Sequence, residues 1–277
     1  MATSIRSRRS ARLITLRHLD HMDDLSRYAL LGGVLFFAST LHSMVGFAFG
    51  LFAVPVLLLC GFQPYEAIVI CNTSVIIHGL ISVTRSVEKP AWRQILWMVA
   101  IGSAAQLIGV WILGRLISLD RAKVCQIFGV ILVAVLVVKL VLHPEPRDHL
   151  PVGWGVLTMI ASGIISGMSG MGGPPIVLWL TAHKWSNDRI RVTLWTMFAM
   201  LSFSNLSWQL YRFNGPAWHA AGLGLLLTPV MLLGRVPGTW AAARMTPTAL
   251  RRGATAILVI VAGYSILQPY LLHSLHR

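Results

Sequence analysis

The stretch Gly167-Met168-Ser169-Gly170-Met171-Gly172-Gly173-Pro174-Pro175 has apolar sequence on both sides. Relative to alanine, glycine costs about 1 kcal/mol and proline about 3 kcal/mol inside a helix, so a continuous helix is not expected to pass through it. Irregular backbone at membrane depth persists only where neighbouring protein or a polar cavity satisfies its N–H and C=O groups. In a membrane protein, this stretch therefore predicts a broken helix beside a cavity.

The composition places the chain in a membrane. Hydrophobic residues make up 56% of its 277 residues and charged residues 12%, whereas a soluble domain has roughly 25% charged residues. Several apolar stretches, including 190–211 and 217–240, reach the ~20 residues that cross a bilayer. The stretches at 49–61 and 174–184 are shorter, and each follows a glycine cluster. We expect an all-α integral membrane protein.

The net charge of +14 does not indicate nucleic-acid binding, because the basic residues are concentrated before the first apolar stretch and in short links. This distribution is typical of charges that anchor helix ends at the lipid surface. By the positive-inside rule, the basic start favours a cytoplasmic N-terminus. The arginines concerned are Arg6, Arg8, Arg9, Arg12, Arg17 and Arg27.

Several common site types have no pattern in this sequence. Cys60, Cys71 and Cys125 form no CxxC pair, and the ten histidines form no HxxxH or HExxH set. We therefore expect no metal and no cofactor. A GxxxxGK[ST] loop is also absent, so any transport must draw on an ion gradient or a partner rather than on ATP hydrolysis by this chain.

Landmarks recur in the same order in the two halves, roughly 124 to 129 residues apart. The pairs are 45–50 with 169–173, 90–92 with 215–218, and 109–115 with 238–244. We predict two structural repeats of four to five helical segments, each starting with a broken or re-entrant helix. The number of crossings per half decides whether the repeats are inverted, and the sequence leaves that number open. The predicted divisions are a basic tail at 1–28, a first transmembrane repeat at 29–142, a link at 143–151, a second repeat at 152–273 and a tail at 274–277.

The glycine-rich break followed by proline, its copy in the first half, and the repeated Trp and Gly-x-x-x-x-Gly-Arg-like landmarks resemble the TauE/SafE sulfite-exporter family. The resemblance covers about residues 30–270, and the first copy departs from it with Phe47, Ala48 and Phe49 in place of small residues. It implies a transporter of sulfite, sulfonates or thiosulfate. We accordingly predict a multi-pass protein of the bacterial cytoplasmic membrane.

A half-helix that begins near Pro174 would offer an anion its free N–H groups and the positive end of the helix dipole. Proline suits a first helical turn, while Gly170, Gly172 and Gly173 would let a ligand approach the backbone. Gly46 and Gly50 are the counterparts in the first half. The alternative is that these glycines only allow close packing of helices.

Other polar residues within apolar segments could complete an anion site. Arg235 could bind the anion through its planar guanidinium or could instead extend to the lipid surface. His42, Asn72 and Asn205 could donate hydrogen bonds, although such residues more often bond to their own backbone or bridge helices. If H⁺ or Na⁺ drives transport, His42, His78 and Glu66 are the coupling candidates, but Glu66 follows a Pro-Tyr turn typical of the lipid surface.

Two alternatives belong to other classes. Gly167-Met168-Ser169-Gly170 matches the Gly-x-Ser-Gly of intramembrane serine proteases, but that chemistry needs a histidine base, and His183 and His219 lie at segment ends. A passive anion channel could also be lined by broken helices. We predict a secondary transporter of small anions, with no catalytic residues and an unspecified oligomeric state.

Overall fold

The structure, a computed structural model, describes residues 24–84, 86, 88–141, 147 and 150–274. Most of the predicted basic tail, most of the predicted link and nearly all of the C-terminal tail lie outside these residues. The helices are α2 (Asp24–Val45), α3 (Phe49–Leu59), α4 (Pro64–Thr84), α5 (Trp92–Leu116), α6 (Arg121–Val141), α7 (Val152–Ser169), α8 (Gly173–Thr181), α9 (Asn187–Leu226), α10 (Thr228–Arg244) and α11 (Pro247–Ser274). The predicted all-α class is confirmed.

Among the described residues, five helices (α2, α4, α5, α6 and α7) are long and apolar enough to cross a membrane. The α9–α10 pair adds a sixth span if it is counted as one bent unit. Apolar side chains cover much of the outer surface, with Trp111 and Phe203 more than half exposed. In a membrane these side chains would face lipid, which explains why so many large apolar residues are exposed.

Both predicted helix breaks are present. The chain leaves α2 at Gly46 with φ of +92° and leaves α7 at Gly170 with φ of +70°. Both angles fall in the left-handed region, which glycine adopts without steric cost. The short helices that follow, α3 and α8, have 11 and 9 residues. Each is too short to span the membrane alone.

The second half contains two further distortions. Helix α9 is kinked at Asn214, which has φ of 47° and lies just before Gly215 and Pro216. The chain then bends by 50° between α9 and α10, although the sequence predicted one segment at 217–240. Pro229 in the first turn of α10 explains the interruption. Proline has no backbone N–H, so a helix that continued through it would lose a hydrogen bond to the preceding turn.

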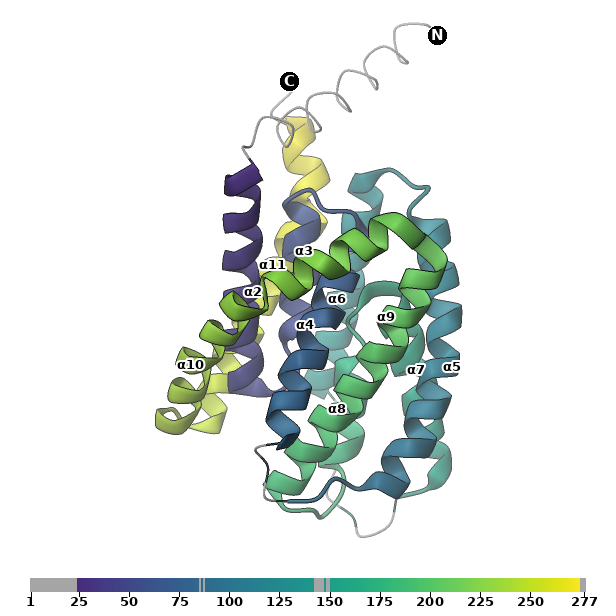
Figure 1. The fold of residues 1–277 in the computed structure, drawn as a ribbon, viewed down its shortest axis with the longest axis vertical. Helices are drawn as coiled ribbons and strands as arrows, with labels where there is room; N and C mark the ends of the chain where they lie inside the picture. The colour runs from purple at the N-terminus through teal and green to yellow at the C-terminus, as the bar shows by residue number, and fades with distance from the viewer. Residues whose placement is uncertain (1–23, 85, 87, 142–146, 148–149, 275–277) are drawn as a thin grey trace, which may run out of the picture.

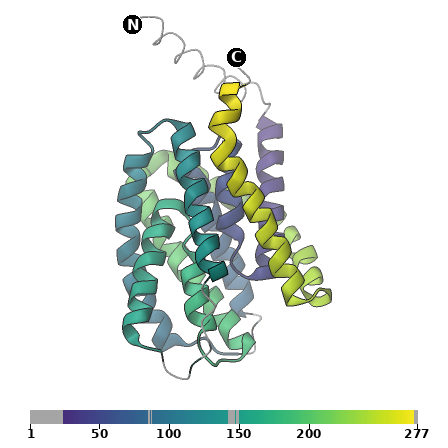
Figure 2. The ribbon, with the colours of Figure 1, turned by 180° about the vertical axis from the view of Figure 1, so that it is seen from behind.

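The helices pack in pairs that join the two halves. Helix α4 lies along α9, α5 along α7, α2 along α10, and α6 along α11. Figure 1 shows α4 and α9 in the centre, with α5 and α7 on one side and α2 and α10 on the other. Figure 2 shows α6 and α11 on the opposite face. Exchanging α2 with α7, α3 with α8, α4 with α9, α5 with α10 and α6 with α11 leaves this pattern of pairs unchanged.

Directions within the pairs bear on how the halves are related. Tyr65, at the start of α4, stacks on Phe213 late in α9 with ring centroids 5.0 Å apart. Gly79, late in α4, packs on Ala199 in the first half of α9, so the two helices run antiparallel. The two-repeat hypothesis makes α4 and α9 equivalent helices. Because they run antiparallel, the hypothesis requires that the two repeats be inverted relative to each other.

Close helix crossings occur at glycines in corresponding positions. Gly109 of α5 packs against the carbonyl of Ile164 in α7, and Gly238 of α10 packs against the carbonyl of Thr40 in α2. Gly109 and Gly238 are one of the landmark pairs found in the sequence. Small residues let backbones approach this closely in a membrane, where packing rather than hydrophobicity holds helices together.

Candidate functional site

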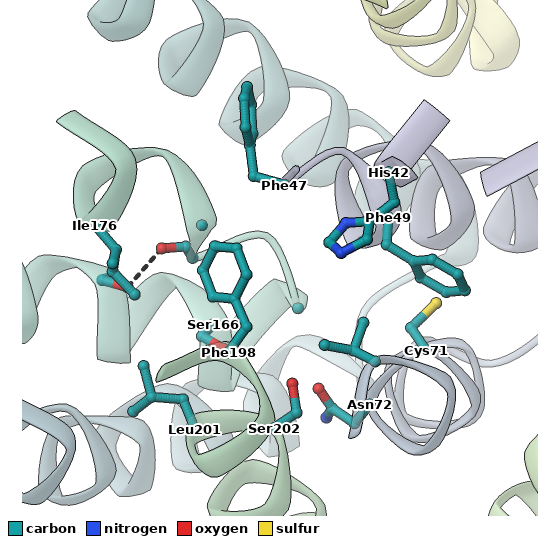
Figure 3. Close-up of a pocket in the computed structure, with 16 residues that line it drawn as sticks. His42, Phe47, Phe49, Cys71, Asn72, Ser166, Ile176, Phe198, Leu201 and Ser202 are labelled. Carbon is teal, nitrogen blue, oxygen red and sulfur yellow. Dashed lines mark hydrogen bonds between the residues drawn. The ribbon is translucent and has the colours of Figure 1, made fainter. Parts of the chain in front are cut away.

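The two helix breaks meet at a cavity of ≈ 60 Å³ near the middle of α4 and α9. A site that holds one water needs ~10–15 Å³ of accessible volume, so the cavity could hold several waters or one small anion. Its walls come from both breaks and from α2, α4, α7 and α9 (Figure 3). The lining residues are His42, Phe47, Phe49, Gly50, Cys71, Asn72, Val75, Ser162, Ser166, Gly170, Gly172, Gly173, Ile176, Phe198, Leu201 and Ser202.

The glycines at the breaks do two different things. A Cβ at Gly50 would collide with the carbonyl oxygen of Gly170, and a Cβ at Gly172 would collide with the carbonyl of Ser162. A Cβ at Gly173 would instead meet the ring of Phe198 at 3.3 Å. Gly50 and Gly172 thus permit close backbone packing, while Gly173 faces side chains around the cavity. The packing interpretation applies to Gly50 and Gly172, and the approach of a ligand at Gly173 stays a prediction.

The starts of two half-helices face this cavity. Residues in the first turns of α3 and α8 line it, and neither N-cap residue, Ala48 or Gly172, supplies a capping side chain. The first N–H groups of a helix have no partner within the helix and carry its positive partial charge. Pro174 and Pro175 remove two such donors from α8, so α3 offers more N–H groups than α8, the reverse of the emphasis that the sequence suggested.

Two polar side chains on the cavity wall have unsatisfied groups. His42 is 3% exposed and Asn72 6%, and His42 Nδ1 and Asn72 Nδ2 have no hydrogen-bond partner among the described residues. Figure 3 shows the polar ends of Asn72 and Ser202 and the ring of His42 turned toward the cavity. Leaving a buried polar group unsatisfied costs about 1–3 kcal/mol. A polar guest in the cavity would remove that cost.

Asn205 lies behind the cavity rather than in its wall. Its Nδ2 donates to the carbonyl oxygen of Ser166 at 3.0 Å, and Gln209, one turn on, donates to the carbonyl of Gly167 at 3.1 Å. These bonds hold the end of α7 just before the second break. Ser162 acts on the other side of the break, since its hydroxyl donates to the carbonyl of Gly172.

Other predicted site residues lie outside the lining. His78 is one layer behind His42, with the ring centroids 4.7 Å apart. Arg235, on the half-buried face of α10, interacts electrostatically with both histidines. Glu66 lies in the first turn of α4 and accepts a hydrogen bond from the backbone N–H of Gln63 at 2.9 Å, so it caps that helix.

Gly46 and Pro174 are next to lining residues without lining the cavity themselves. Ser162 and Ser166, which the sequence analysis did not single out, do line it. Their spacing of four residues on α7, ending just before the glycine-rich stretch, was the available signal, because residues four apart share a helix face.

Fold and site together define a multi-pass membrane protein in which two broken helices enclose a polar cavity. The sequence profile of the family described as "Sulfite exporter TauE/SafE" matches residues 31–265. The chain therefore belongs to the TauE/SafE sulfite-exporter family of membrane transporters, and the resemblance seen in its sequence is confirmed. Neither a curated protein nor a solved structure matches the chain.

Proposed function

We propose that this protein is a secondary transporter of small sulfur oxyanions, with sulfite and thiosulfate preferred over larger organosulfonates. The observation that carries the proposal is the cavity, where the starts of α3 and α8 meet the unsatisfied side-chain nitrogens of His42 and Asn72. None of the described residues that line it is acidic. An anion that leaves water needs such donors and dipoles to replace its hydration.

The size of the cavity supports the preference. At ≈ 60 Å³ it suits a compact inorganic anion, whereas a sulfonate with a carbon chain would have to displace Phe198 or Leu201. Both side chains belong to α9, so a larger substrate would require that helix to move. The cytoplasmic membrane of a bacterium and a cytoplasmic N-terminus stay predictions.

The test is uptake of labelled thiosulfate by proteoliposomes under imposed pH and Na⁺ gradients. We expect saturable uptake that exceeds the external concentration under one of these gradients. Uptake that only equilibrates would favour the passive channel, because a channel cannot accumulate its ion. No flux above that of protein-free liposomes would contradict the proposal.

A pair of variants tests the location. Gly173→Leu would place a side chain against Phe198 at the cavity, and we expect it to stop uptake. Gly222→Leu on α9 is the matched control, because a Cβ there meets nothing within 4 Å. If Gly173→Leu transports as well as the control, the anion does not pass through this cavity.

The protease alternative finds no support in the geometry of Ser169. Its hydroxyl donates to the carbonyl of Ile165 on its own helix at 2.7 Å. The ring of His183, meanwhile, packs against Trp179 and Trp185 with centroids 4.2 and 4.5 Å away. A nucleophile needs a base within hydrogen-bond reach. Ser169→Ala is therefore expected to keep most transport activity.

A further inference from the structure

Corresponding positions in the two halves carry different chemistry beside the cavity. If Gly46 corresponds to Gly170, then His42 on α2 corresponds to Ser166 on α7. In the second half, Asn205 of α9 bonds to Ser166. In the first half, the ring of His78 on α4 contacts the ring of His42. One half therefore has two imidazoles where the other has a hydroxyl and an amide.

The two imidazoles are buried and adjacent. His42 and His78 are 3% and 2% exposed, and their rings meet edge to face with centroids 4.7 Å apart. His42 lines the cavity with its Nδ1 unsatisfied. His78 Nε2 lies 3.3 Å from the hydroxyl of Ser43, and its Nδ1 lies 3.5 Å from that of Ser82.

The charged and titratable groups that face this pair are few. Helix α10 contributes Arg235, α4 contributes the thiol of Cys71 on the cavity wall, and α3 contributes only the ring of Phe49, 6.0 Å from that of His42. The acidic residues whose side chains the structure describes lie at helix starts or in links, namely Glu66, Glu88, Asp120 and Asp188. The pair therefore has a fixed positive charge nearby and no carboxylate beside it among these described side chains.

Like charges this close oppose one another. Two imidazolium rings 4.7 Å apart, with Arg235 nearby, would repel strongly in a buried site. The two neutral rings can therefore take up at most one additional proton between them. An anion in the cavity would favour the protonated form of His42, since an opposite charge within about 4–6 Å favours the charged form of a titratable group. Proton and anion would then each increase the affinity for the other.

We propose that the His42–His78 pair is a proton-binding site that takes up one proton together with the anion, which makes the protein a proton–anion symporter. The proton comes from solvent, binds the free lone pair of an imidazole nitrogen and leaves with the anion, so no bond is made or broken in the substrate. The proposal rests on the proposed function, because the anion supplies the charge that retains the proton. The Ser166–Asn205 position in the other half cannot titrate and contributes no second proton.

The first test is calorimetry of thiosulfate binding to the purified wild-type protein near neutral pH, in buffers of different ionisation enthalpy. Thiosulfate is the probe because sulfite itself takes up a proton near neutral pH. We expect the measured binding heat to change linearly with the ionisation enthalpy of the buffer. The slope of that line gives the number of protons taken up, which should be about one per anion. Binding with a slope of zero would overturn this inference alone. Absence of binding would overturn the proposed function and the inference with it.

Variants identify the proton site. We expect His42→Gln to bind thiosulfate more weakly than the wild type, with a slope near zero, and to lose accumulation driven by a pH gradient. His219→Gln, at an exposed position on α9, is the control and should behave as wild type. A His42→Gln protein that still takes up about one proton per anion would overturn the assignment. If His42→Gln does not fold, the number of protons taken up per anion is compared between the wild type and His78→Gln. We expect a lower number for His78→Gln, and an unchanged number would overturn the assignment.

Discussion

The break between α2 and α3 and the break between α7 and α8 are both centred on a glycine in the left-handed conformation, Gly46 in one and Gly170 in the other. Their surroundings differ. The first break carries Phe47 and Phe49 and lies beside buried histidines, while the second is rich in glycine and is held by the amides of Asn205 and Gln209. The backbone geometry is thus shared by the two halves, and the side chains are free to differ. The predictions below test this division, from the largest effect to the smallest.

Backbone contact between the breaks should be the least tolerant of change. Gly50→Val would push a side chain into the carbonyl of Gly170, and backbone cannot move aside as a side chain can. We expect a loss of about 3 kcal/mol or more and little folded protein, as measured by size-exclusion chromatography and thermal melting. Gly33→Val on α2 is the control, because nothing lies within 4 Å of its added Cβ. Equal yields of the two variants would show that the breaks do not need this contact.

Asn72 should matter for binding, and Asn205 for stability. If the free Nδ2 of Asn72 donates to the anion, Asn72→Ala loses a hydrogen bond to a charged group, worth roughly 1.5–3 kcal/mol. The dissociation constant for thiosulfate would then rise about 10- to 150-fold. Asn205→Ala loses a bond to backbone and should lower stability by about 1 kcal/mol with little change in affinity. Calorimetry and melting of both variants measure the contrast, and a larger affinity loss at Asn205 would reverse the assignment.

Adjacent glycines at the second break should respond differently to one methyl group. Gly173→Ala adds a Cβ next to Phe198, whose ring must move slightly. We expect folded protein with an affinity lowered by about tenfold, equivalent to 1.4 kcal/mol. Gly172→Ala adds a Cβ against the carbonyl of Ser162 and should lower the melting temperature first. Identical behaviour of the two variants would mean that the break responds as one packed unit.

Arg235 is expected to have the smallest effect. Direct contact with the anion was one of the two interpretations that the sequence left open. Arg235 does not line the cavity, so we expect it to act on the site through its electric field. We expect Arg235→Gln to raise the dissociation constant by roughly two- to fivefold, an effect that depends on field strength rather than on a lost hydrogen bond. Arg235→Lys keeps the charge and should bind as wild type. A loss as large as that of Asn72→Ala would mean that Arg235 reaches the anion in another state of the protein.

The sequence predicted the helical class, both breaks and the family, because glycine and proline within apolar sequence disfavour a continuous helix whatever the rest of the fold. It could not tell Asn72 from Asn205, since both are amides within apolar helices and only the packing of α4 and α9 decides which one faces the cavity. The serines of α7 were missed for the same reason. Most serines in membrane helices bond to their own backbone, as Ser169 does, so residue type alone did not point to Ser162.

The bend between α9 and α10 has a mechanical consequence. Landmarks before it, Pro90 and Pro216, are 126 residues apart, whereas those after it, Gly109 and Gly238, are 129 apart. The second half thus has three more residues in this interval than the first, slightly less than one turn of an α-helix. The first half lacks these three residues, so it cannot adopt the same bend when the protein changes conformation. If the cavity opens alternately to the two sides of the membrane, we expect α5 to move as a stiff rod and the α9–α10 junction to act as the hinge.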